Sequence, residues 1–193
     1  MIRIQELTTA IRSILALWLI TAIIYPLMIL LIGQVAFSSQ ANGSLITQGD
    51  RVIGSTLIGQ PFSSNKYFWS RPSSINYSTD KTATPTGVSG ASNLAPSNND
   101  LTKRIKSEID RLKVAKVPPT NDLIYTSGSG LDPHISLAAA RNQIDRVAAA
   151  RRIDRAKLET LITSSIDNRF LGIFGEPGVN VLKLNLGLDR SVN

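Results

Sequence analysis

The stretch from Ser13 to Phe37 constrains this chain more than any other part, because it contains no charged residue. At about 1.5 Å per residue, a helix of this length exceeds the roughly 30 Å hydrocarbon core of a bilayer. A buried helix of a soluble protein is rarely apolar on every face over such a length. The apolar region of a cleaved secretory signal has only about 7–15 residues, and residues 39–41 form only a weak cleavage site. We therefore predict a retained transmembrane helix over residues 13–37.

The charges on either side of this helix predict its orientation. Arg3 and Arg12 precede it against a single Glu6, and no charge follows it before Asp50. Because basic flanks stay on the cytoplasmic side, the amino terminus is expected inside and the rest of the chain outside. The predicted organisation is a cytoplasmic tail (1–12), a transmembrane helix (13–37), a small polar linker (38–49) and one extracytoplasmic α+β domain (50–193).

Pro26 lies near the centre of the predicted span. A proline lacks the backbone N–H that would bond to the preceding turn, so it can kink the helix. A kink in a single-span chain suggests packing against helices of another protein, where freed carbonyls find partners. The alternative is a proline that is tolerated without a role.

Composition excludes several classes of function. The chain has 193 residues, a net charge of +7, no cysteine and a single histidine, His134. The absence of cysteine excludes disulfides, thiolate catalysis and cysteine-ligated metals, and one histidine excludes any site that needs two. The basic residues are scattered over the predicted helices rather than gathered in one stripe. They are assigned to solvated faces, anionic lipid headgroups or an acidic partner, and not to nucleic acid.

Periodicity predicts helices placed between a first and a last strand. A strand with a bend is expected within residues 51–62, and apolar alternation predicts a final strand over residues 182–188. The predicted helices run from about 100 to 113, capped by Ser97 or Asn98, from 136 to 151, and from 154 to 166. Residues 122–126 are expected to form a short strand or turn.

Two segments before the first of these helices have unusual composition. Residues 66–69 (KYFW) are interpreted as a satellite hydrophobic cluster in preference to a binding surface. Residues 70–99 are rich in Ser, Thr, Asn, Pro and Gly and show no helical or strand period. Loops of this length are uncommon in compact domains and are usually functional or disordered. We interpret residues 70–99 as a structured docking loop, with flexible coil as the alternative.

The segment SGSGLDPHIS, residues 127–136, contains serines, an aspartate and the histidine within a few positions. It suggests a serine hydrolase using Ser129 or Ser89, but neither serine lies in a G-x-S-x-G nucleophile motif. Catalytic triads also assemble from distant positions, not from one short loop. A phosphate cradle is conceivable because glycines expose backbone N–H groups, but the lysine of a P-loop is absent. A membrane-anchored extracytoplasmic serine hydrolase is the alternative function, and a free-standing anchored binding module is a third.

Four segments in this order carry a family resemblance: GSTLIGQPF (54–62), YFWSRPS (67–73), SGASNLAPSN (89–98) and SGSGLDPHIS (127–136). With the single N-terminal span, they resemble the C subunit of the bacterial Kdp potassium-importing P-type ATPase over essentially the whole chain. The resemblance implies an accessory subunit without catalytic residues of its own. Such a subunit assists assembly and raises the ATP affinity of the pump as a catalytic chaperone.

The resemblance also implies partners and a location. The partners are a channel-like potassium-binding subunit, an ATP-hydrolysing pump subunit, a small membrane peptide and membrane lipid, in the bacterial inner membrane. ATP and potassium are used by the complex, and no cofactor is assigned to this chain. Because the domain is expected outside while ATP is hydrolysed inside, an indirect effect on ATP affinity is favoured over direct ATP contact.

The residues singled out for partner contact or by the family motifs begin within the first motif and end before the predicted helix at 136. They are Gln60, Arg71, Pro72, Ser89, Gly90, Ser92, Asn93, Pro96, Ser97, Asn98, Ser127, Gly128, Ser129, Gly130, Asp132, Pro133 and His134.

Overall fold

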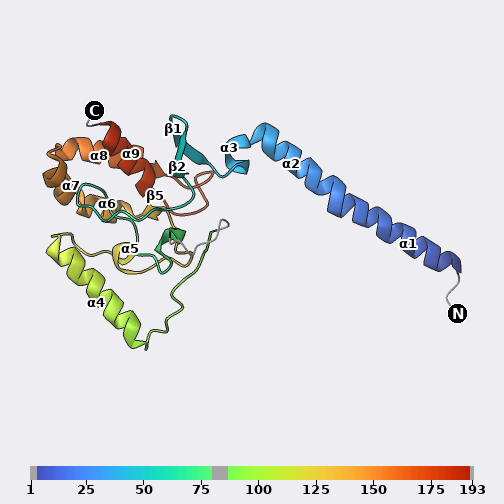
Figure 1. The fold of residues 1–193 in the computed structure, drawn as a ribbon, viewed down its shortest axis with the longest axis horizontal. Coiled ribbons are helices and arrows are strands. Elements are labelled where there is room, and N and C mark those ends of the chain that lie inside the picture. The colour runs from blue at the N-terminus through green and yellow to red at the C-terminus, as the bar shows by residue number, and fades with distance from the viewer. Residues whose placement is uncertain (1–3, 80–86, 192–193) are drawn as a thin grey trace. The chain divides into compact units, whose positions relative to one another are not determined.

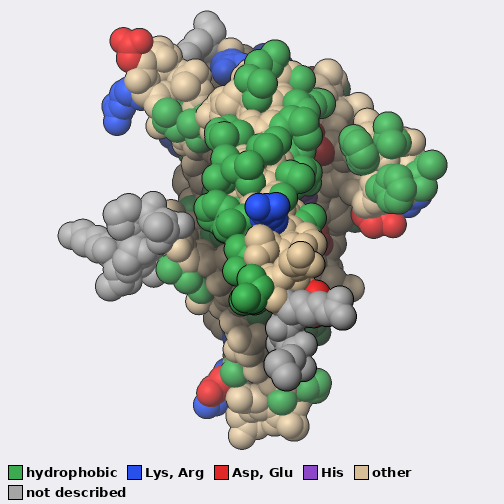
Figure 2. Space-filling model, turned by 90° about the vertical axis from the view of Figure 1, so that its right-hand side faces the viewer, with side chains coloured by type: hydrophobic (Ala, Val, Ile, Leu, Met, Phe, Trp, Pro, Cys, Tyr) green, Lys and Arg blue, Asp and Glu red, His purple; other side chains and the backbone are tan. Residues whose placement is uncertain are grey.

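The computed structural model describes residues 4–79 and 87–191, and the chain divides into two compact units, Met1–Leu45 and Ile46–Asn193. The first unit is a long helix built from α1 (Ile4–Leu19), the π-helical turn η1 (Ile20–Ile24) and α2 (Tyr25–Ala36), followed by the short α3 (Ser38–Ala41). By length and composition, Ile4–Ala36 is able to cross a membrane. Its hydrophobic side chains are exposed along its length, and Figure 2 shows hydrophobic side chains gathered at the centre of the face in view. Because the helix begins at Ile4, it includes most of the predicted cytoplasmic tail, residues 1–12.

The helix changes its hydrogen-bond pattern next to Pro26, where the sequence predicts an irregularity. The Tyr25 N–H donates to the Ile20 carbonyl, five residues back. A proline ring would collide with the carbonyl four residues before it, and a widened π-turn relieves that collision. The proline therefore leaves a local bulge in an otherwise continuous helix.

The second unit holds a two-stranded sheet, a three-stranded sheet and most of the helices (Figure 1). The strands are β1 (Leu45–Gln48), β2 (Arg51–Ser55), β3 (His134–Ile135), β4 (Ile166–Asp167) and β5 (Gly178–Asn180). The helices are the 3₁₀ turn η2 (Asn76–Ser78), α4 (Asn99–Val114), α5 (Asn121–Ile124), α6 (Leu137–Asn142), α7 (Ile144–Arg151), α8 (Arg155–Ser164) and α9 (Val181–Arg190). β5 pairs antiparallel with β3 on one edge and with β4 on the other. The α+β class is confirmed.

The core of the second unit lies between its helices and the extended segment at residues 67–70. Its fully buried side chains include Phe68, Leu112, Leu158, Ile162 and Leu184. The aromatic residues predicted to form a satellite cluster are thus part of the main core. Packing of this apolar surface is the main source of stability in a domain that has no disulfide.

Two buried amide side chains hold this extended segment from opposite sides. Asn185 accepts from the Phe68 N–H at 2.9 Å and donates to the Phe68 carbonyl at 3.0 Å. Gln143 does the same for Trp69, at 2.7 and 3.3 Å. The backbone N–H and carbonyl groups of Phe68 and Trp69 are buried and would need hydrogen bonds from neighbouring strands in a sheet. The two amide side chains supply these hydrogen bonds instead.

Two guanidinium groups cover the Trp69 ring. Arg146 lies 3.8 Å and Arg111 4.4 Å from the ring centroid. Burial, together with the neighbouring charge of Arg111, lowers the pKa of Arg146 to about 10. Trp69 is therefore enclosed by cation–π contacts and is not a free binding aromatic.

The helix predicted near residues 100–113 is confirmed as α4, and Asn98 caps it by accepting from the Asp100 N–H at 2.8 Å. The strand predicted over residues 182–188 is wrong, because these residues form α9. Alternating leucines satisfy either period, but Asn180 caps a helix by accepting from the Lys183 N–H at 3.1 Å. Burial of Val181, Leu184, Asn185 and Leu188 then follows the helical spacing.

Three further boundaries differ from the predictions. The single helix predicted over 136–151 is broken at Gln143 into α6 and α7, where the side chain turns inward to Trp69. The helix predicted to reach Ile166 ends at Ser164, because Ile166 begins the strand that pairs with β5. The strand or turn predicted at 122–126 is the single helical turn α5.

Candidate functional site

Segments that the sequence singles out separately meet in one place, which we call the motif cluster: residues 59–60, 71–74, 89–90 and 127–134. The Gly59 N–H donates to the Leu131 carbonyl and the Gly90 N–H to the Ser129 carbonyl, both at 2.8 Å. The Ser73 hydroxyl donates to the Gly130 carbonyl at 2.7 Å. The described parts of the predicted docking loop are thus bonded to the SGSGLDPHIS segment, while residues 80–86 lie outside the described residues.

Close backbone contact explains two glycines of the motif cluster. Gly130 has a φ of +68°, and a Cβ there would lie 2.5 Å from the Ile75 side chain and 2.7 Å from the Gly90 carbonyl oxygen. A Cβ at Gly59 would lie 2.4 Å from the Tyr77 ring and 2.7 Å from the Asp132 carbonyl oxygen. A side chain at either position would push the segments of the motif cluster apart.

The serines considered as nucleophiles make local structural bonds. The Ser129 hydroxyl accepts from the Leu131 N–H at 3.1 Å, and the Ser127 hydroxyl accepts from the Gly130 N–H at 2.9 Å. Ser89 donates to the Ser129 carbonyl at 3.2 Å. The His134 ring lies within ion-pair distance of the Asp132 and Asp167 carboxylates, and Ser89, Ser127 and Ser129 are bonded to backbone groups instead. This geometry gives no support to a serine hydrolase.

The other singled-out residues have different surroundings. Gln60 donates from its side chain to the Ile53 carbonyl and accepts at its own carbonyl from the Ser70 hydroxyl. The Pro133 carbonyl accepts from the Val181 N–H, and Pro72 is half-buried. A Cβ at Gly128 would meet open space. The irregular segment that leads to α4 contains Ser92, Asn93, Pro96 and Ser97, and Asn93 has a φ of +51°.

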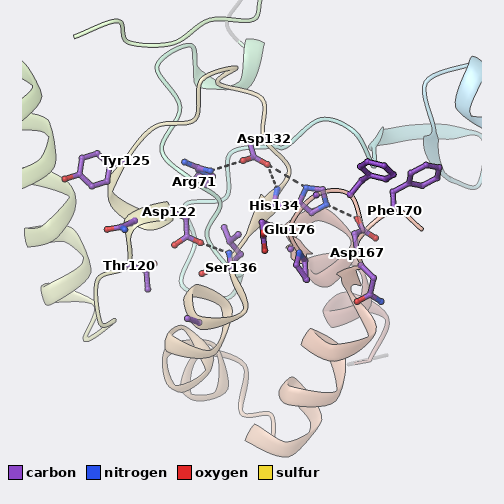
Figure 3. Close-up of a pocket in the computed structure, with 18 residues that line it drawn as sticks. Arg71, Thr120, Asp122, Tyr125, Asp132, His134, Ser136, Asp167, Phe170 and Glu176 are labelled. Carbon is purple, nitrogen blue, oxygen red and sulfur yellow. Dashed lines mark hydrogen bonds and ion pairs between the residues drawn. The ribbon is translucent and has the colours of Figure 1, made fainter. Parts of the chain in front are cut away.

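Ion pairs extend from the motif cluster to the three-stranded sheet (Figure 3), and one further pair reaches α9. Arg71 contacts Asp132 at 3.0 Å, and the Asp132 carboxylate also accepts from the His134 backbone N–H at 3.0 Å. The His134 Nε2 lies 2.9 Å from an Asp167 oxygen, and Lys183 Nζ lies 2.7 Å from the other Asp167 oxygen. These bonds tie the SGSGLDPHIS segment to β4 and α9.

Three titratable groups here have shifted pKa values with identifiable causes. Burial raises the pKa of Asp167, but the bonds from His134 and Lys183 outweigh it and hold the value below its usual range. Burial likewise raises the pKa of Asp122, and hydrogen bonds, chiefly from the Ser136 backbone N–H, more than reverse the shift. Burial raises the pKa of Tyr77 to about 12, and its hydroxyl donates to the Arg71 carbonyl at 2.7 Å. These groups keep fixed charge states at neutral pH.

An open hollow of about 1010 Å³ lies beside this network (Figure 3). Its lining includes Arg71, Asp122, Asp132, His134 and Asp167, and the loop after β4 contributes Phe170. In the described residues, no group of three or more His, Asp or Glu side chains is arranged to hold a metal ion. The polar groups are engaged with one another, which suits a structural surface better than a reaction centre.

Sequence reasoning missed Asp167 and Lys183 in this network, as well as the buried clamps Gln143 and Asn185. Asp167, Lys183 and Asn185 lie far along the chain from the motifs, and no local pattern marks any of the four side chains. It also missed the apolar run FLGIF at residues 170–174, although its lack of charge is visible in the sequence.

Comparison with known protein families gives a match over nearly the whole chain. Residues 7–190 match the model of the KdpC family, described as the K⁺-transporting ATPase c chain. The chain belongs to the KdpC family.

Named relatives agree with this assignment. A Synechocystis protein called potassium-transporting ATPase KdpC subunit is 60% identical over 97% of this chain and 99% of its own length. A KdpC subunit 1 of Nostoc is 56% identical over 96% of both chains, and a KdpC subunit of Sorangium cellulosum is 43% identical over 96% of this chain and 98% of its own. The resemblance seen in the four motifs is confirmed. As a KdpC-family chain, the protein is an accessory and not a catalytic subunit of a potassium-transporting ATPase.

Proposed function

We propose that this chain works without chemistry of its own, as a membrane-anchored assembly subunit of a potassium-importing ATPase. Its partners are the potassium-binding subunit, the ATP-hydrolysing pump subunit and the small membrane peptide implied by the family resemblance. The observation that carries the proposal is the motif cluster, whose polar groups bond to one another. A serine hydrolase would require a nucleophilic serine near His134, whereas the hydroxyls of Ser127 and Ser129 accept backbone hydrogen bonds within their own turn.

The motif cluster is suited to docking because it is rigid and still partly exposed. Ser74, Ser89 and Ser129 are exposed while their hydroxyls or carbonyls are bonded to neighbouring segments. A surface that is already ordered loses little conformational freedom when a partner binds. We therefore assign the partner-contact role to the exposed side of the motif cluster.

The domain is proposed to lie outside the membrane and to raise the ATP affinity of the pump indirectly. The orientation rests on the basic residues before the anchor. An outside domain changes ATP binding only if it prefers one conformational state of the pump over another. In that case, ATP and this chain stabilise the same state from opposite sides of the membrane.

Cysteine labelling in intact cells tests this arrangement, because the natural chain has no cysteine. Ser129→Cys is expected to react with a membrane-impermeant maleimide before permeabilisation, and Gln5→Cys, in the amino-terminal part of the anchor, only afterwards. The reverse pattern would place the domain inside and make direct ATP contact the better explanation.

The assembly role is tested separately in the purified complex. We expect Ser129→Ala to retain potassium-stimulated ATP hydrolysis, since its hydroxyl stabilises a turn and has no catalytic role in this proposal. Complex prepared without this chain should need more ATP for half-maximal activity. Equal ATP requirement with and without the chain would contradict the proposed effect on ATP affinity.

A further inference from the structure

The loop between β4 and β5 exposes a compact apolar tip. Phe170, Leu171, Ile173 and Phe174 are 70, 73, 72 and 61% exposed, and residues 170–174 contain no charge. Two of these side chains also line the rim of the open hollow, and Figure 3 shows Phe170 at the outer side of the network. Four adjacent, largely exposed apolar side chains mark an interaction site more often than a solvated surface.

The backbone of this tip is closed on itself. Phe170 and Phe174 face each other in an antiparallel bridge, with the Phe170 N–H donating to the Phe174 carbonyl at 2.8 Å and the reverse bond at 3.0 Å. The Ile173 N–H donates to the Phe170 carbonyl at 3.1 Å. These internal bonds reduce the cost of moving the tip into an apolar phase, where water is not available to backbone groups.

The turn also holds a leucine in a conformation that usually selects glycine or asparagine. Leu171 has a φ of +53°, followed by Gly172 at +74°. A bulky side chain at a positive φ is uncommon and is found where another interaction favours it. Within the described part of the domain, the Leu171 side chain is exposed and so lacks a packing reason to be there.

The base of the loop carries a paired charge on each side. Arg169 and Glu176 form an ion pair at 3.1 Å, so the loop presents an apolar tip above a base without net charge. Such a base can sit at the level of lipid headgroups without a large electrostatic penalty, because its charges are paired and remain hydrated.

The first strands of the domain lie beside β5, the strand that follows the loop. Asn180, at the end of β5, donates to the carbonyl of Thr56, directly after β2, and Figure 1 shows β2 and β5 beside each other. Only residues 37–45 separate the apolar helix from the domain. Even fully extended, they span about 30 Å, so the domain stays within reach of the bilayer surface.

We propose that the apolar tip, residues 170–174, inserts into the interface of the membrane leaflet on the domain's side. The occupant of this surface is phospholipid, and the tip gives the domain a second attachment point besides its helix. The proposal rests on the membrane anchor of the proposed function but not on which side of the membrane the domain lies. It follows from an apolar, self-bonded, projecting turn tied to a membrane by a short linker.

A depth measurement on the full chain tests the insertion. A single cysteine at Leu171 is labelled with an environment-sensitive nitrobenzoxadiazole probe, and the chain is reconstituted alone into vesicles of phosphatidylcholine and phosphatidylglycerol. The control, Ala149→Cys, is exposed on α7. We expect the Leu171→Cys probe to be quenched by nitroxide lipids and to be several-fold less accessible to aqueous iodide than the control probe.

A second variant tests whether the apolar character of the tip causes the protection of the probe. Ile173→Asp places a charge at an exposed position of the tip and should leave the fold intact by circular dichroism. Combined with Leu171→Cys, it is expected to restore iodide accessibility to the control level. A Leu171→Cys probe as accessible as the control in vesicles would overturn the proposal.

The same probe separates lipid from protein as the occupant. If the probe is protected only after the other subunits are added, the tip docks on protein and the lipid assignment is wrong. Because the first measurement uses the chain alone, it does not depend on ATPase activity. Failure of the assembly role would instead appear as unchanged activity of a complex that lacks this chain.

Discussion

At the scale of single residues, the motif cluster is controlled by which positions tolerate a side chain. Gly128 and Gly130 stand two positions apart in the same loop. Gly128 faces open space, whereas a Cβ at Gly130 would meet the Ile75 side chain and the Gly90 carbonyl. Adding a methyl group therefore meets no obstacle at Gly128 but causes a steric clash at Gly130.

Gly130→Ala is expected to destabilise the domain, and Gly128→Ala to have little effect. The positive φ of Gly130 alone costs an alanine about 1–2 kcal/mol, and the contact with Gly90 adds to it. Denaturant unfolding of the purified full chain measures both variants. Equal stability of the two variants would show that the loop moves aside at no cost.

The charged pairs make a second prediction at this scale. The pKa of Asp167 is lower in the folded chain than in the unfolded chain, so its ionised form contributes stability. That contribution is complete above the unfolded value of about 3.9 and is lost as the pH falls through the folded value. We expect Asp167→Asn to be less stable than the natural chain at neutral pH, with a difference that shrinks below about pH 4.

Unfolding curves collected across this pH range check the Asp167 prediction. The difference at neutral pH should be modest, because both Asp167 and His134 are partly solvated. A stability difference that remains constant from neutral to acidic pH would show that the carboxylate charge is not responsible.

At the scale of elements, α9 shows how a helix can resemble a strand in sequence. Leu182, Leu184, Leu186 and Leu188 alternate with other residues, yet the helix buries Leu184 and Leu188 completely and leaves Leu186 half-buried. Asn185 also faces the core, where it satisfies both backbone groups of Phe68. The helix thus supplies apolar packing and the hydrogen bonds of a missing strand.

Alanine substitutions distinguish the two structures of this segment. Leu184→Ala is expected to lower the free energy of unfolding by about 2–5 kcal/mol, as for a fully buried leucine. Leu186→Ala, at a half-buried position, should cost less than about 1 kcal/mol. In a strand with one buried face, the two leucines would be equivalent, so equal losses would contradict the helix.

At the scale of the whole molecule, the chain combines a long, exposed apolar helix with a folded domain that has its own core. Their stabilities have different origins, because the helix satisfies its backbone bonds internally while the domain depends on burial from water. The π-turn before Pro26 is the one irregularity in the described part of the apolar helix, Ile4–Ala36. If this π-turn packs against helices of partner subunits, a substitution at Pro26 should weaken assembly of the complex and leave the domain folded.

Pro26→Leu tests this separation. We expect the variant to remain in the membrane with a folded domain, while several-fold less of the other subunits is recovered with it. Leu30→Ile, in the same helix, serves as the control and should give normal recovery. Normal recovery of the complex with Pro26→Leu would mean that the bulge is merely tolerated.

Local sequence was sufficient where one segment determines its own structure. The uncharged run predicted a helix long and apolar enough to cross a membrane, Asn98 and the apolar stripe predicted α4, and four motifs identified the family. The candidate positions of the motif cluster were also found this way, since glycine and serine runs are visible in the sequence.

Only the tertiary structure decided the features that depend on distant partners. It brought the motif segments together, paired His134 with Asp167, and used Gln143 to break a helix that periodicity predicts as continuous. It also left the tip at residues 170–174 exposed, although a short apolar run is equally compatible with a core. The physical reason is that burial and charge pairing are properties of neighbours in space, whereas caps, turns and membrane spans depend on neighbours along the chain.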